Sequence, residues 1–204
     1  RSANDERLML GLKLFALSTR HPPMRRLLQA ASEVTTDVAT VTLQSCHLAL
    51  YRDGTLFIAV QADSPGRLSL SVRLGSEVDL LTTGSGLAML SFQSEERRAR
   101  MLVAHGTPDL PDETRAEIAK ALSTGHVARP SAQTMGVMDL AFPIIGRTGD
   151  AVAALTIPFI GRLDPVEAPS AAACLDTLAA AAARLSGEVP GSISGEFDHT
   201  EAVA

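Results

Sequence analysis

Aromatic residues are scarce in this chain of 204 residues: they make up 3%, with one tyrosine and no tryptophan. Hydrophobic residues still reach 46%, which excludes a disordered chain and is enough for one sizeable core of leucine, isoleucine, valine and alanine. No apolar run approaches the roughly 18 residues of a membrane-spanning helix. Only two cysteines, Cys46 and Cys174, are present, so a disulfide framework is excluded and a reducing compartment is favoured.

An excess of positive charge is missing as well. Lysine and arginine number 18 against 23 aspartate and glutamate residues, which leaves a net charge of −5. The chain therefore has no electrostatic footprint for nucleic acid on its own. It starts at Arg1 without an initiator methionine and without a signal peptide, so we expect an upstream domain that is not part of this sequence.

Hydrophobic spacing predicts helices near both ends of the chain. Residues 5–17 would form a helix with so much apolar surface that another part of the protein or a partner subunit must cover it. Residues 24–44 follow helical spacing closely after a pair of prolines. A last helix is expected over about 169–187, and residues 188–204, which lack periodicity, are expected to be a disordered tail.

Between these helices the hydrophobic period changes to two, which predicts strands. Asp53-Gly54 would turn a hairpin between strands 46–52 and 55–60, and the alternation at 68–74 predicts another half-buried strand. Three helices and three strands should follow, near 83–92, 94–105, 112–124, 126–129, 137–145 and 151–157. Because the short connections require antiparallel pairing, we predict an α+β fold with about six strands and helices packed on the sheet.

A polar segment rich in glycine, Thr83-Gly84-Ser85-Gly86, stands at the expected start of a helix. The first N–H groups of a helix lack intrahelical partners, and glycine lets a ligand approach the backbone. A ligand carboxylate would fit there, with the hydroxyl of Ser85 as a further donor. The alternative is an ordinary helix start, capped by Thr82 or Thr83, in which the glycines allow tight packing. The sequence leaves both interpretations open.

Two charged residues, Arg129 and Asp139, stand in predicted strands that are otherwise apolar. Asp139 shares a strand face with Val137, where a carboxylate is costly unless it is paired or hydrogen-bonded. Either the two charges form a structural ion pair, or they line a polar pocket in which Arg129 binds a ligand carboxylate through two parallel hydrogen bonds. Thr156 could face the same pocket or be an ordinary β-branched strand residue.

No catalytic constellation or metal-binding cluster stands out. Cys46 and His47 are neighbours on a strand, so their side chains point to opposite faces and cannot readily share a metal or act as nucleophile and base. A buried thiol beside a hydrogen-bonded histidine is the simpler interpretation. A small hydrolase built on Ser85 or Cys46 would need a nearby base, for which only His47 and His126 are candidates. The sequence therefore predicts no enzyme, no catalytic residue, no metal and no cofactor.

Several short segments, in a fixed order and spacing, carry a family resemblance. They are Gln44-Ser45-Cys46-His47-Leu48, Arg73-Leu74-Gly75, the run from Thr82 to Leu90, Gly125-His126-Val127, Leu140-Ala141-Phe142-Pro143-Ile144 and Ala153-Ala154-Leu155-Thr156-Ile157. Together with the last helix they span roughly residues 8–187. In these segments the chain resembles the C-terminal effector-binding domain of IclR-type (isocitrate lyase regulator type) bacterial transcriptional regulators.

The resemblance implies a GAF-like fold in a cytoplasmic bacterial regulator that assembles as a homodimer or as a homotetramer, a dimer of dimers. Residues 1–20 would be a linker helix from a missing N-terminal winged helix-turn-helix, 21–187 the effector-binding domain, and 188–204 a flexible C-terminal tail. The effector would be a small organic acid. DNA would be bound only through the missing domain, and no membrane partner is implied.

By the same resemblance, the effector-binding residues would be Gly84, Ser85, Arg129, Val137, Asp139 and Thr156. Three positions depart from the family. Leu87 stands where a basic residue is common, Arg129 stands where an acidic or polar residue is commoner, and Pro158 replaces a residue that bears a hydroxyl. The identity of the effector therefore does not carry over. A domain that only oligomerises, with its cavity filled by apolar side chains, is the remaining alternative.

Overall fold

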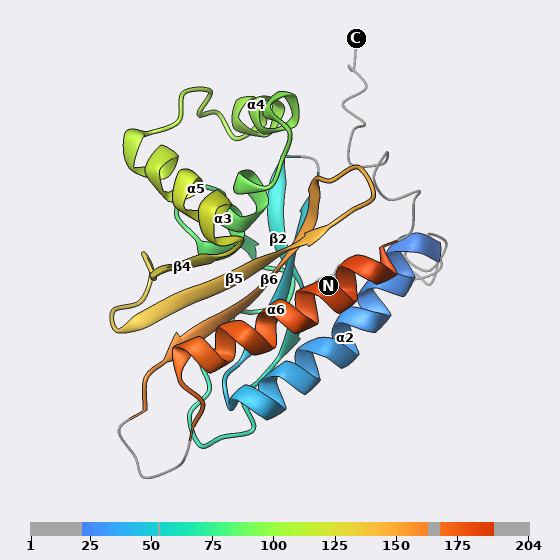
Figure 1. The fold of residues 1–204 in the computed structure, drawn as a ribbon, viewed down its shortest axis with the longest axis vertical. Coiled ribbons are helices and arrows are strands. Elements are labelled where there is room, and N and C mark those ends of the chain that lie inside the picture. The colour runs from blue at the N-terminus through green and yellow to red at the C-terminus, as the bar shows by residue number, and fades with distance from the viewer. Residues whose placement is uncertain (1–21, 53, 163–167, 190–204) are drawn as a thin grey trace, which may run out of the picture.

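The computed structural model of the protein describes residues 22–52, 54–162 and 168–189 (Figure 1). The predicted helix at 5–17 lies outside these residues, as does the predicted tail from residue 190 onward. The last helix, α6 (Ala171–Glu188), is followed by Val189, which is still buried in the core. Among the described residues, the core therefore includes Val189, which lies beyond the expected boundary at residue 187.

An antiparallel sheet forms the centre of the described part of the chain and confirms the predicted α+β class (Figure 1). Its six strands lie in the order β3-β2-β1-β6-β5-β4, and each neighbouring pair is antiparallel. Their bounds are β1 (Cys46–Arg52), β2 (Thr55–Ala62), β3 (Glu77–Val78), β4 (Val127–Pro130), β5 (Val137–Ile145) and β6 (Ala151–Ile160).

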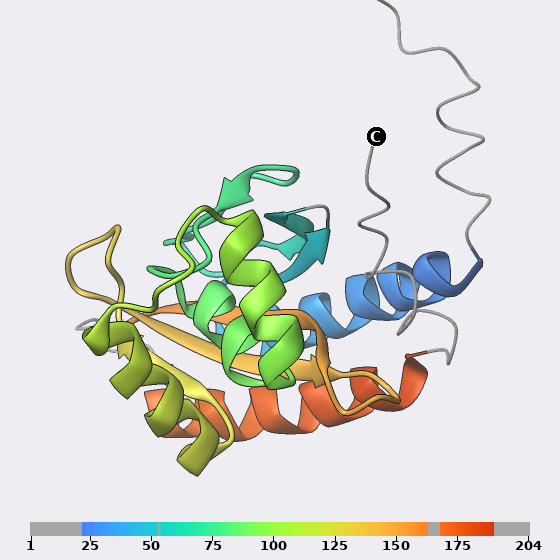
Figure 2. The same cartoon turned by 90° about the horizontal axis from the view of Figure 1, so that it is seen from above.

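Helices cover both faces of this sheet (Figure 2). On one face α2 (Pro22–Thr42) and α6 pack side by side, and on the other α3 (Gly84–Ser91) contacts β5 and β6, with α4 (Glu95–Ala104) and α5 (Asp112–Thr124) beyond it. All five helices correspond to predicted ones. Within the described ranges, no helix has both the length and the hydrophobicity needed to cross a membrane.

The period of two along β1 divides the core into two clusters. Cys46, Leu48 and Leu50 pack in the cluster beneath α2 and α6, whereas Ala49 and Tyr51 pack in the cluster beneath α3. Side chains of neighbouring residues point to opposite faces of a strand. His47 is therefore on the α3 side, opposite to Cys46, as the sequence predicted.

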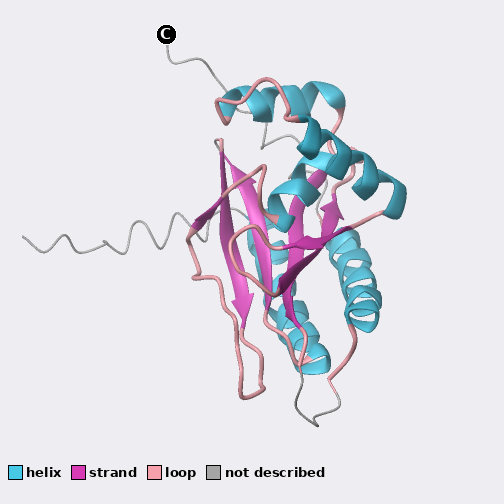
Figure 3. Cartoon of the chain, turned by 90° about the vertical axis from the view of Figure 1, so that its left-hand side faces the viewer, coloured by secondary structure: helices cyan, strands magenta, loops and turns pink. Residues whose placement is uncertain are grey.

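The predicted strand at 68–74 is wrong, because this segment is an irregular loop (pink in Figure 3). Leu68 and Leu74 are 66% and 62% exposed, so the alternation does not mark a buried face. The hydroxyl of Ser71 donates to Asp63 within the loop. At this edge of the sheet the short strand β3 pairs with Leu56 and Phe57 of β2, and the loop forms one wall of a cavity.

Gln44 joins the end of α2 to the end of β6. Its Nε2 donates to the carbonyl of Ile160 at 3.0 Å, and its Oε1 accepts from the N–H of the same residue at 3.1 Å. The side-chain amide thus pairs both backbone groups of Ile160, as a neighbouring strand would.

We predict that Gln44→Ala lowers the free energy of unfolding by about 2 kcal/mol, because both backbone groups of Ile160 lose a part-buried partner. Urea unfolding measures this change. Gln133→Ala, at an exposed loop residue, is the control and should change the stability by less than about 0.5 kcal/mol. Equal, small effects of the two substitutions would contradict the role given to Gln44.

Candidate functional site

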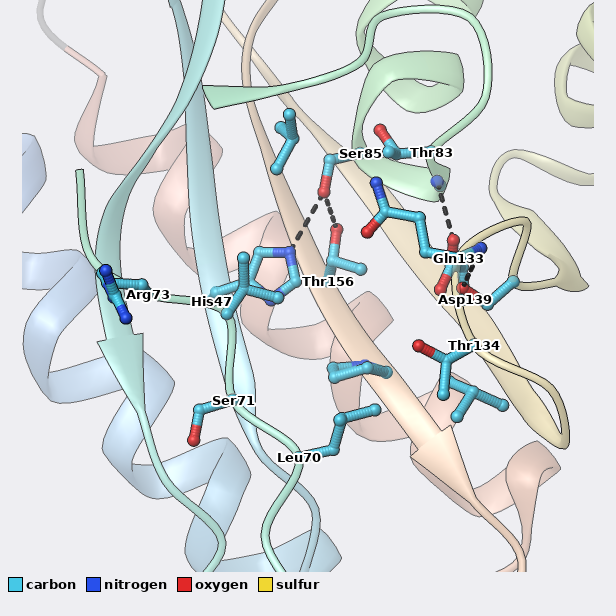
Figure 4. Close-up of a pocket in the computed structure, with 16 residues that line it drawn as sticks. His47, Leu70, Ser71, Arg73, Thr83, Ser85, Gln133, Thr134, Asp139 and Thr156 are labelled. Carbon is cyan, nitrogen blue, oxygen red and sulfur yellow. Dashed lines mark hydrogen bonds between the residues drawn. The ribbon is translucent and has the colours of Figure 1, made fainter. Parts of the chain in front are cut away.

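A cavity of about 260 Å³ lies where the start of α3 meets the sheet (Figure 4). Its walls come from β1, β5 and β6, from the loop that contains Arg73, and from the loop before β5 that contains Gln133. Ten of its 16 lining residues have polar side chains. The cavity is therefore not filled by apolar side chains, as a domain that only oligomerises would require.

The strand register brings the polar side chains of the sheet together. His47 on β1 lies opposite Thr156 on β6, and Thr156 lies opposite Ala141 on β5. Asp139 precedes Ala141 by two residues and so points to the same face of the sheet. All of these positions face the start of α3, which lies above this face.

A chain of hydrogen bonds joins three of these elements (Figure 4). The hydroxyl of Ser85 on α3 lies 2.8 Å from the hydroxyl of Thr156, and Nε2 of His47 lies 3.1 Å from the same Ser85 oxygen. The three side chains are almost fully buried, at 6%, 3% and 1% exposure for His47, Ser85 and Thr156. The network fixes the position of α3 on the sheet and lines the cavity with polar atoms.

Asp139 makes a second contact between the sheet and the start of α3. Its Oδ2 accepts a hydrogen bond of 3.0 Å from the N–H of Gly84, and the residue is only 9% exposed. A Cβ on Gly84 would lie 2.5 Å from the Cβ of Asp139. Only glycine therefore lets the helix start approach this carboxyl group so closely.

Of the two interpretations that the sequence leaves open, the open helix start does not hold for most of its N–H groups. The N–H of Gly84 donates to Asp139. The N–H of Gly86 donates at 3.1 Å to the hydroxyl of Thr83, the N-cap residue. Leu87 donates to the Thr83 carbonyl at 3.0 Å. Within the described ranges, the N–H of Ser85 is left without a hydrogen-bond partner. The alternative interpretation, a threonine cap with closely packed glycines, describes most of this segment.

Burial shifts the pKa values of two groups in the cavity. It lowers the pKa of His47 from 6.5 to about 4, so the imidazole is neutral at physiological pH. Burial also raises the pKa of Asp139 above its usual value, although hydrogen bonds from Gly84 and Ser131 and the charge of Arg129 act in the opposite direction.

The predicted site residues divide into two groups. Gly84, Ser85, Val137, Asp139 and Thr156 line the cavity, as does Pro158. Arg129 does not line it: it lies across from Asp139 in the backbone register of β4 and β5, and its Nε donates to the carbonyl of Pro130 at 3.3 Å. Among the described residues no ion pair joins the two, so the structure contains neither the predicted ion pair nor the predicted pocket arginine.

Among the lining residues that the sequence reasoning missed, His47 and Arg73 are the two with ionisable side chains. His47 was interpreted correctly as a hydrogen-bonded histidine, but its place in the pocket was not recognised. The signal was available, because Cys46 is apolar and its neighbour had to face the other side of the sheet. Arg73 was assigned to a strand, and no periodicity could have shown that its loop borders the cavity.

The contact between Ser85 and His47 has the distance of a nucleophile and its base. Nevertheless, no carboxylate of the described residues orients the second ring nitrogen of His47, and a pKa of about 4 makes the imidazole a weak base. The same part of the chain contains no group of three or more histidine, cysteine, aspartate or glutamate residues that could hold a metal ion. The arrangement is therefore better suited to binding than to proton transfer.

Comparison with known proteins gives a consistent family signal. A family model described as "Bacterial transcriptional regulator IclR C-terminal" matches residues 24–186. The crystal structure of Thermotoga maritima IclR is similar, with 22% identity, 93% of this chain and 78% of that chain covered, and a TM-score of 0.68. So is an IclR homolog from Microbacterium hydrocarbonoxydans complexed with 4-hydroxybenzoate, with 22% identity, 92% and 78% coverage, and a TM-score of 0.71.

The C-terminal domain of the E. coli transcriptional regulator KdgR is also similar, with 18% identity, 81% of this chain and 99% of that chain covered, and a TM-score of 0.66. At such identities these structures show a common fold. No curated protein matches the chain.

Proposed function

The chain belongs to the IclR family of bacterial transcriptional regulators, through the C-terminal domain of that family, and we propose that it senses a small organic acid in the cavity at the start of α3. The observation that carries this proposal is the buried hydrogen-bond chain of His47, Ser85 and Thr156 at the wall of an open cavity. Convergent polar groups in a hollow with apolar surroundings are typical of ligand sites. The 4-hydroxybenzoate complex of the Microbacterium homolog supports an acid as the ligand.

We propose Gly84, Ser85, Val137, Asp139 and Thr156 as effector contacts, with His47 and Arg73 added to them, because all seven line the cavity. Arg129 acts on the site only through its charge, which lowers the pKa of Asp139. These groups bind and orient a ligand, and the proposed function includes no turnover.

We further propose a regulatory mechanism that extends beyond the described residues. Residues 1–20 would connect this domain to a DNA-binding domain, and two or four subunits would assemble in the cytoplasm. Because a ligand shifts an equilibrium only through its different affinity for the two states, the effector would favour one arrangement of subunits. A coupling free energy of about 1–3 kcal/mol is typical for such control. Family membership supports this proposal.

We predict that the chain binds 4-hydroxybenzoate and that Thr156→Val weakens this binding about tenfold, because the Ser85 hydroxyl loses the partner that orients it. Isothermal titration calorimetry measures both affinities. Thr36→Val removes a hydroxyl from an exposed position on α2 and is the matched control, expected to leave the affinity unchanged. Binding that is equally strong in the Thr156 variant would contradict the site, and the absence of binding by 4-hydroxybenzoate or any other small organic acid would contradict the function.

A further inference from the structure

We propose that Asp139 determines which acids this cavity accepts: it closes the start of α3 to a ligand carboxylate and binds a hydroxyl or ammonium donor of the ligand, whose carboxylate then lies toward Arg73. This inference rests on the proposed function, because it assigns an orientation to a ligand of the same cavity. It also reverses one of the two interpretations of the sequence, in which the ligand carboxylate lies at the helix start.

The start of α3 already has a carboxyl partner from the chain itself. Oδ2 of Asp139 already accepts the N–H of Gly84 at 3.0 Å, in the place where a ligand carboxylate would otherwise bind. The residue is only 9% exposed, so water screens its charge poorly. A second carboxylate placed beside it would be repelled, since two like charges at one site disfavour each other. The chain thus supplies its own carboxyl group to the helix start.

The side of the cavity opposite Asp139 has a basic side chain. Among the lining residues, Asp139 and Arg73 are the two acidic or basic side chains apart from His47, which is neutral at physiological pH. Figure 4 shows them on opposite sides of the His47–Ser85–Thr156 group. Arg73 is exposed and belongs to the loop wall. A ligand with a carboxylate at one end and a donor at the other matches this distribution of charge.

Asp139 can accept more hydrogen bonds than the one it receives from Gly84. A carboxylate offers about four lone-pair positions, and the N–H of Gly84 occupies one of them. Asp139 can therefore accept another donor from the cavity. Gly84 must remain without a side chain for this arrangement, since a Cβ there would collide with Asp139. The selectivity is thus built into the contact between α3 and β5.

The test compares five probes by isothermal titration calorimetry near neutral pH: benzoate, 4-hydroxybenzoate, 4-(aminomethyl)benzoate, 4-methoxybenzoate and terephthalate. The hydroxyl and ammonium probes distinguish the two kinds of donor. We expect at least one of them to bind about tenfold more tightly than benzoate, because hydrogen bonds to charged groups are the strong ones. The methoxy probe, which has no donor, and terephthalate, which has a second carboxylate, should bind no more tightly than benzoate.

Asp139→Asn should reverse this preference. The asparagine oxygen can still accept from Gly84, and its amide then presents a donor to the cavity, which favours the methoxy and dicarboxylate probes over the hydroxyl and ammonium probes. Asp109→Asn, which removes an exposed carboxylate elsewhere, is the matched control and should leave the order of affinities unchanged. Urea unfolding checks that both variants are folded.

Arg73→Gln tests the other end of the ligand and does not touch the buried contact. It should weaken the binding of benzoate and of 4-hydroxybenzoate by the same factor, so the preference for the hydroxyl probe is preserved. Arg67→Gln is the control, because Arg67 lies in the same loop but outside the cavity wall, and it should change neither affinity. Terephthalate that binds as tightly as the donor probes, with no effect of Asp139→Asn, would overturn the inference but leave the proposed function intact. Failure of these probes to bind would overturn the inference, and failure of every other small organic acid as well would overturn the proposed function.

Discussion

Replacing Gly86 by alanine is expected to lower the free energy of unfolding by about 3 kcal/mol or more. A Cβ at this position would lie 2.3 Å from the carbonyl oxygen of Leu80 and 2.6 Å from that of Asp79. Both are backbone atoms, which cannot rotate away as a flexible side chain would. The start of α3 would have to move off the preceding turn, and the hydroxyl of Ser85 would lose its position between His47 and Thr156.

Gly187→Ala is the matched control for this substitution. Gly187 also lies in a helix, but no atom other than its own neighbours lies within 4 Å of an added Cβ. Alanine is preferred over glycine in helices by about 0.5–1 kcal/mol, so the control should be neutral or slightly stabilised. Urea unfolding compares the two variants with the unchanged chain. A Gly86→Ala variant that is as stable as the control would show that α3 does not pack this closely in solution.

The second large effect is a loss of stability in mild acid that depends on His47. Burial lowers its pKa in the folded chain to about 4, against 6.5 for an exposed histidine. As the pH falls from 6.5 toward 4, the unfolded chain takes up a proton that the folded chain does not. Protonation therefore favours unfolding over this range. The difference of roughly 2.5 pH units corresponds to about 3 kcal/mol at the acid end of this window.

Urea unfolding across this pH window measures the effect, and His47→Gln is the variant that removes it. Glutamine cannot take up a proton, so the stability of the variant should depend less steeply on pH, whatever its absolute stability is. Asp139 has a raised pKa in the folded chain and opposes the trend, because its protonation at low pH favours the folded state. The comparison isolates His47 because Asp139 is present in both proteins. Identical slopes would contradict the burial of a neutral imidazole.

Much of the fold could be predicted because local patterns agree with the tertiary structure. The period of two along Cys46–Arg52 predicted β1 and showed that the side chains of Cys46 and His47 point to opposite faces of the sheet. Asp53-Gly54 predicted the hairpin that follows. The segment 68–74 shows the limit. Its alternation is as regular as that of β1, but a strand also needs a neighbouring strand to pair with, and β2 pairs at this edge with β3, through Leu56 and Phe57, and not with residues 68–74.

The candidate site was predictable in location but not in chemistry. Glycines and a serine at a helix start, together with polar residues in apolar strands, marked the residues that meet at the cavity. The sequence could not show that Asp139 would reach the N–H of Gly84, because that contact depends on the packing of α3 against β5 over a separation of 55 residues. For the same reason it could not exclude Arg129 from the cavity or include Arg73.

The central claim is that an acid binds between Arg73 and Asp139, beneath the start of α3. A crystal structure of the chain grown with 4-hydroxybenzoate measures this most directly. We predict density for one ligand in the cavity, with its hydroxyl at Asp139 and its carboxylate toward Arg73. Density only in the separate groove lined by Leu28, Leu50 and Phe57, or a carboxylate bound at Gly84 with Asp139 displaced, would contradict it.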